Sequence, residues 1–129
     1  MLTKQKIEEG KKAIKQKDHT YDGFHEDDGC IHIAYEWLDA QKKLQTPNKR
    51  TMRPIKHLIE RWAGRYVSTA DVQVAAHLHP DITGAYPFFN ISTNLVEPNT
   101  ARLEKIKIAF SQPDYRNSHK ENDYKRKEI

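Results

Sequence analysis

The sequence has a single cysteine and no long apolar run, and these absences argue against several classes of protein. With Cys30 alone among 129 residues, no disulfide framework can form within the chain, which favours a reducing compartment. No apolar stretch approaches the ~20 residues that a bilayer-spanning helix needs, so we expect no membrane protein. The N-terminal residues lack the apolar centre of a secretory signal, and we therefore expect a cytoplasmic protein.

Apolar residues are also scarce, because they make up 36% of the chain whereas charged residues make up 31%. This composition predicts a modest core, and the length suits one domain of about 100–150 residues. We expect that single globular domain over residues 21–111. A polar, basic, partly helical arm over 1–20 would precede it, with too few apolar residues for a firm core face, and a disordered polar tail over 112–129 would follow it.

The positive charge of lysine and arginine is missing from two segments of the chain. Residues 21–41 and 67–101 contain no lysine or arginine, whereas residues 42–66 contain eight of them and one acid. The formal net charge is +4. Such blocks either complement each other within the fold or present a basic face to an anionic partner.

Apolar periodicity predicts a mainly α fold, a compact bundle of four to five short helices. The first clear helix follows the capping carboxylates Asp27 and Asp28, the second begins at Pro54 and ends at Gly64, and the third runs from a capping box at Ser68 to Pro80. Residues at helical spacing (i, i+3, i+4 and i+7, or part of that series), apolar except for His79, support these helices and a last one: Ile31, Ala34, Tyr35 and Leu38; Ile55, Leu58, Ile59 and Trp62; Val72, Ala75, Ala76 and His79; Leu103, Ile106, Ala109 and Phe110.

The third helix and the residues after it suggest a helix-turn-helix-like core, a general motif rather than a named family. Residues 70–78 would form the bracing helix and residues 90–96 a short second helix, although a short β-hairpin near 86–92 is the alternative. Amide and hydroxyl side chains of the second segment can read base edges: Asn90, Ser92, Thr93 and Asn94.

A basic cluster lies just before and along the second helix. We expect its members to contact phosphates: Lys49, Arg50, Arg53, Lys56, Arg61 and Arg65. The leading hypothesis is therefore a small non-enzymatic protein that binds nucleic acid, DNA above all, or has a regulatory role. The sequence determines neither the base sequence that the protein would bind nor its oligomeric state, and a homodimer is compatible with the motif.

A protein-protein interaction module, an inhibitor or adaptor, is the alternative hypothesis. The acidic segment 21–41 would meet a basic partner, and the aromatic run after it would supply anchors. The residues assigned to this surface are Asp27, Asp28, Asp39, Tyr86 and Phe88.

Histidine, cysteine and acidic residues gather in one short segment, but we expect neither a metal nor another cofactor. The segment contains His25, Asp27, Asp28, Cys30 and His32, and this spacing matches no standard zinc site. Of the pair in the third helix, His79 should share the apolar face and His77 should not. The sequence also lacks the common phosphate-binding, dinucleotide-binding, esterase and metalloprotease motifs, which argues against an enzyme.

Overall fold

Helices dominate the regular structure of the computed structural model, which describes residues 2–17, 26–47, 55–117 and 124–129. The mainly α fold is therefore confirmed. The helices are α1 (Lys4–Lys17), α2 (Asp28–Asp39), α3 (Ile55–Ala63), α4 (Thr69–Leu78), the 3-10 helix η1 (Thr100–Leu103) and α5 (Asp114–Asn117). The strands, two residues each, are β1 (Gly84–Ala85), β2 (Phe88–Phe89), β3 (Val96–Glu97) and β4 (Arg126–Lys127).

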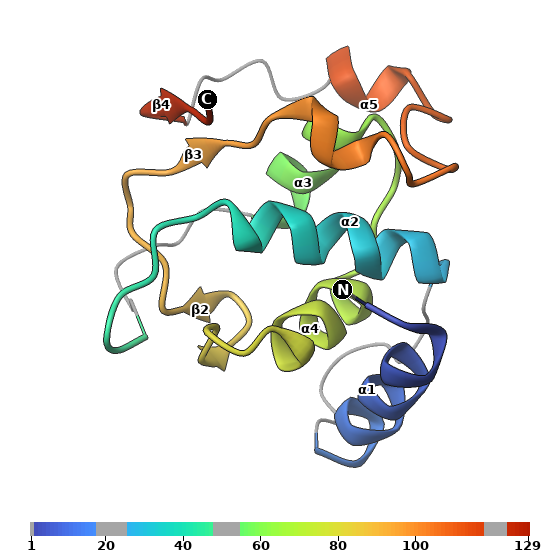
Figure 1. Cartoon of the computed structure of the whole chain (residues 1–129), viewed down its shortest axis with the longest axis vertical. Helices are drawn as coiled ribbons and strands as arrows, with labels where there is room; N and C mark the ends of the chain where they lie inside the picture. The colour runs from blue at the N-terminus through green and yellow to red at the C-terminus, as the bar shows by residue number, and fades with distance from the viewer. Residues whose placement is uncertain (1, 18–25, 48–54, 118–123) are drawn as a thin grey trace.

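The centre of the molecule is the contact between α2 and α4, both of which the apolar periodicity predicts (Figure 1). The carboxylate of Asp27 caps α2 by accepting a 2.8 Å hydrogen bond from the Gly29 amide. Ser68 and Asp71 form a reciprocal capping box at the start of α4. Each cap pairs amides that a helix start leaves without an intrahelical partner, which fixes where both helices begin.

Helix α1 packs against α4 and belongs to the core, contrary to the expectation that its apolar residues are too sparse for a core face (Figure 1). Its Ile7 side chain is buried. Gly10 allows the two helices to approach closely, because a Cβ at this position would lie 3.0 Å from side-chain atoms of Val74 and Leu78. The buried Ile7, the partly buried Ile14 and Gly10 place this lysine-rich helix against the core.

The predicted second helix of a helix-turn-helix is wrong, whereas the alternative hairpin is confirmed. Strands β1 and β2 pair antiparallel, and residues 90–95 contain only an isolated bridge from Ile91 to Lys43. Asn90 explains why this segment is not helical, because its buried side-chain amide bonds the backbone of surrounding loops. It donates to the carbonyls of Leu44 and Asp81, each at 2.9 Å, and accepts from the Thr83 amide at 2.7 Å.

The predicted last helix over 103–110 is also wrong. The 3-10 helix η1 ends at Leu103, and the residues after it form turns. Phe110 has a φ of 62°, a left-handed backbone conformation that cannot continue a right-handed helix. The apolar spacing of this segment is real, since Leu103 and Ile106 are buried, but turns place those side chains in the core.

The C-terminal residues that the structure describes are ordered against the body, which differs from the expectation of a disordered tail. Strand β4 pairs parallel to β3, and the Tyr124 hydroxyl accepts a 2.9 Å hydrogen bond from the buried indole of Trp37. Glu128 forms an ion pair with Arg102, which has 21% of its side chain exposed. The low aliphatic content of this segment gives no sign of its one partly buried aromatic ring or of its ion pair.

Within the described residues, no helix is both long enough and apolar enough to cross a membrane.

Candidate nucleic-acid interface

The loop after η1 is fixed onto the C-terminal end of α3. The last carbonyls of a helix have no intrahelical partner, and here those of Ala63 and Gly64 accept hydrogen bonds from the Phe110 amide at 2.7 Å and the Gln112 amide at 2.9 Å. The Gln112 side chain in turn accepts from the Tyr66 amide at 2.8 Å. These bonds hold Phe110 at its positive φ, and 41% of this residue is exposed to solvent.

Two contacts between a cation and an aromatic ring lie near this docked loop, and we call the residues that form them, with Tyr115, the aromatic–cation face. The Lys56 ammonium lies 4.4 Å from the centre of the Tyr66 ring, and that ring lies 6.4 Å from the ring of Tyr115. In the second contact, the Arg116 guanidinium lies 5.0 Å from the Phe110 ring centre, and Arg116 follows Tyr115 in α5. The aromatic–cation face therefore comprises Lys56, Tyr66, Phe110, Tyr115 and Arg116, drawn from α3, from the segment after it, from the loop after η1 and from α5.

Burial and the buried Glu60 carboxylate influence the charge states of side chains in this face. Glu60 is 3% exposed and accepts from Lys56 at 3.1 Å and from the Val67 amide at 3.3 Å. Burial, and then the nearby Glu60 carboxylate, raise the pKa of Tyr66 above its ordinary value. The shift favours the protonated Tyr66 hydroxyl, which can donate a hydrogen bond.

A cavity of about 170 Å³ adjoins the face and has two arginines in its wall. Arg61 of α3 and Arg116 of α5 both line it, together with the Thr100 hydroxyl-bearing side chain and the acid Glu97. Its remaining described lining is aromatic, from Trp62 and Tyr124, and the Trp62 indole donates to the Pro98 carbonyl at 2.9 Å. Because Arg116 belongs to both, the cavity and the aromatic–cation face form one surface.

Of the predicted phosphate-contacting cluster, the structure describes three members and separates one of them from the other two. Arg65 is 6% exposed, pairs with Glu26 at 3.2 Å and donates to the Tyr66 carbonyl, so it serves the fold. Lys56 and Arg61 of the cluster do lie at the surface just described. The other three members, Lys49, Arg50 and Arg53, lie outside the described residues.

The predicted base-reading strip does not join that surface. Asn90 is 4% exposed and is engaged by the loops around it, so its assignment to base reading is wrong. Ser92 is half-buried and bonds its amide to the Lys42 carbonyl, whereas Thr93 and Asn94 are exposed. Figure 1 shows the segment between β2 and β3 along the left edge of the molecule and α5 at the upper right.

The acidic residues of the alternative hypothesis are largely neutralised within the fold. Asp28 pairs with Lys11, and Asp39 pairs with His79 at 2.8 Å and with Arg102 at 3.0 Å. The acidic block of the sequence therefore complements basic residues from other blocks. With Asp27 capping α2, each of the three predicted carboxylates has a partner within the fold, and their role in binding another protein stays a prediction.

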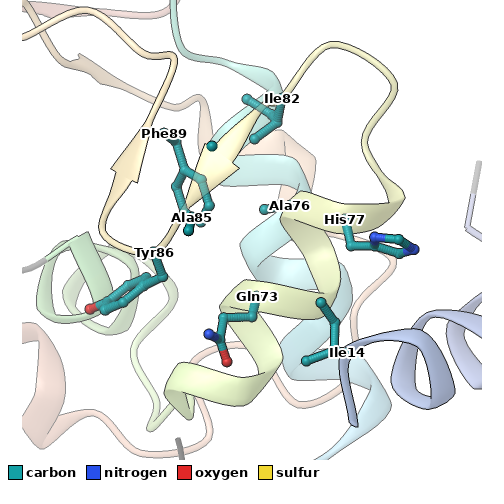
Figure 2. A pocket seen from close by; sticks show the side chains of 9 residues that line it. Ile14, Gln73, Ala76, His77, Ile82, Ala85, Tyr86 and Phe89 are labelled. Atoms are coloured by element: carbon teal, nitrogen blue, oxygen red, sulfur yellow. The ribbon is translucent and has the colours of Figure 1, made fainter. Parts of the chain in front are cut away.

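The aromatic residues of that hypothesis lie at the hairpin. Phe88 of β2 is half-buried, and Tyr86 forms one wall of a groove of about 350 Å³ that also has Ile14 of α1 and Gln73 of α4 in its lining (Figure 2). An interaction role for this groove stays a prediction.

The predicted histidine and cysteine cluster is not assembled in the described residues, among which no group of three His, Cys, Asp or Glu side chains could hold a metal ion. His25 lies outside them. The Cys30 thiol is buried and donates to the Tyr66 carbonyl, and burial raises its pKa to about 12. His79 is buried as its position on the apolar face predicts, and its Nδ1 accepts from the Asp81 amide at 3.1 Å while Nε2 faces Asp39.

Sequence reasoning missed the aromatic half of the surface. Apolar spacing predicts Phe110 on a buried helix face, and composition predicts a disordered tail that includes Tyr115 and Arg116. The available signal was the mixture of aromatic and basic residues between 110 and 116 in a chain of net positive charge. Comparison with protein-family models, curated proteins and solved structures gave no match.

Proposed function

We propose that the protein is a small nucleic-acid-binding protein that uses the aromatic–cation face and the adjoining arginine cavity. The observation that carries the proposal is that cations stand over two partly exposed rings, Lys56 over Tyr66 and Arg116 over Phe110. Arginines that stand over aromatic rings can contact phosphates, while the rings offer π faces to bases. Protein-nucleic acid affinity depends chiefly on such phosphate contacts.

The distribution of charge supports this partner over an acidic or neutral protein. The block over residues 42–66, which includes α3, has eight basic residues and one acid, and that acid, Glu60, is buried under the face. The arginines Arg61 and Arg116 approach the same cavity from separate elements. A surface of this kind raises the local potential for an anion.

We infer a non-enzymatic role, because the Cys30 thiol and the buried His79 imidazole are both engaged by the fold. The Cys30 thiol is buried with a raised pKa, and thiols react as thiolates. Both ring nitrogens of His79 face partners in the structure.

Salt-titrated filter binding with a mixed-sequence oligonucleotide, offered both as a single strand and as a duplex, tests the proposal. We expect measurable binding that weakens steeply as salt increases. Arg116→Gln should weaken it and reduce the slope of log affinity against log salt by about 0.7–0.9, the loss expected for one phosphate contact.

Lys12→Gln is the matched control, since it removes one exposed charge from α1, which lies at the opposite end of the molecule from α5 (Figure 1). It should leave affinity nearly unchanged. Equal losses in both variants, or no binding of either oligonucleotide by the wild-type protein, would reject the assignment.

A further inference from the structure

Helix α4 cannot serve as a reading helix for duplex DNA. Of its ten residues, seven are buried against neighbouring elements. A helix enters the major groove only when one complete face is exposed to the base edges. Helix α5 has four residues, and its Arg116 and Tyr115 already stand beside the rings of the aromatic–cation face, so neither of these elements has the geometry for duplex readout.

The exposed ring of Phe110 instead fits an unpaired base. Residues that hold a positive φ without being glycine are strained, and they persist where surrounding contacts determine them. Here two backbone hydrogen bonds from the end of α3 fix the loop, and the result is an aromatic side chain that is 41% exposed. In a duplex the base faces are covered by their neighbours, so a protein ring can stack only on bases of a single strand.

The cavity beside this ring fits the phosphate that links such bases. Arg61, Arg116 and Thr100 supply donors at its wall, and Glu97 supplies the opposing charge. Arg116 connects the two features, because it lines the cavity and also stands over the Phe110 ring.

Resting on the proposed function, we propose that the nucleic acid is single-stranded, with a base stacked on Phe110 and a backbone phosphate in the cavity of Arg61 and Arg116. The recognition is of the sugar-phosphate chain and of base faces, so it tolerates many sequences. Glu97 limits the affinity of the phosphate site by its like charge.

The test compares a ~15-nucleotide oligothymidylate with a duplex of equal length, a length near the upper site size of single-strand binders. We expect the single strand to bind about tenfold tighter or more. If the duplex binds as tightly and Arg116→Gln weakens it, the single-strand inference is overturned while the proposed function stands. If neither binds, both fail.

Two variants test where the base and the phosphate bind. Phe110→Asn keeps a residue that tolerates positive φ and should weaken oligothymidylate binding about tenfold, while thermal unfolding confirms that the variant is folded. Glu97→Gln should strengthen oligothymidylate binding a few-fold. Unchanged binding in the folded Phe110→Asn variant, or weaker binding in Glu97→Gln, would overturn the placement.

Discussion

At the scale of single residues, Asn90 shows how one amide can organise several loops. Its side chain is buried and bonds three backbone groups, in Leu44, Asp81 and Thr83. Sequence reasoning counted the same side chain among surface groups for base reading, because the residue type is suited to both roles. Only the burial of the position separates them, and burial depends on segments distant in sequence.

Asn90→Ala should therefore destabilise the fold rather than reduce nucleic-acid binding directly. Removing the amide leaves three backbone groups without their partner, and we expect a loss of about 3 kcal/mol in the free energy of unfolding. Urea denaturation measures this loss. Asn94→Ala, at an exposed position of the same segment, should change stability by less than about 0.5 kcal/mol; a similar loss in both variants would contradict the buried role.

At the scale of elements, the sequence predicts those helices whose signals are local. Helices α2, α3 and α4 follow from apolar spacing, from caps at Asp27 and Ser68, and from the stop at Gly64. The candidate interface could not be predicted in this way. Its members lie between 56 and 116 in the chain, and the loop that presents Phe110 depends on hydrogen bonds to the end of α3.

Gly64→Ala should disturb both the end of α3 and the interface. The φ of 64° strains a residue with a side chain, and the added Cβ would lie 3.1 Å from the Phe110 Cα and 3.2 Å from the Arg116 side chain. We expect about 1–2 kcal/mol of destabilisation, measured by urea denaturation, together with weaker oligonucleotide binding.

Gly64→Asn adds the same Cβ but tolerates positive φ better, so it should be less destabilising than Gly64→Ala. If the two variants are equally destabilised, crowding rather than backbone strain determines the requirement for glycine.

At the scale of the whole molecule, Arg102 joins distant parts of the chain. Its guanidinium pairs with Glu36 at 2.9 Å and Asp39 at 3.0 Å on α2, and with Glu128 at 2.6 Å beyond β4. The hydrogen bond from Arg102 lowers the pKa of Glu128. Burial opposes ionisation of Asp39, but hydrogen bonds from His79 and Arg102 outweigh it and lower that pKa as well.

Because both carboxyl pKa values are lower in the folded state, their contribution to stability is present above the ordinary carboxyl pKa of about 4.5 and is lost as pH falls through the lower folded values. Arg102→Gln should lower the free energy of unfolding by about 2 kcal/mol near neutral pH. It should also make the stability fall less between neutral and acidic pH. Urea denaturation between about pH 3 and 7 covers this window. If the variant loses as much stability as wild type when the pH falls, Arg102 does not determine the acid sensitivity of the fold.

The environments of the two tryptophans have an optical consequence. Trp62 lines the arginine cavity, whereas Trp37 is fully buried and bonds Tyr124. Indole emission responds to nearby charge and polarity, so a Trp37→Phe protein would carry Trp62, beside the cavity, as its one tryptophan. Its intensity and wavelength would then report occupancy of that cavity without any attached label.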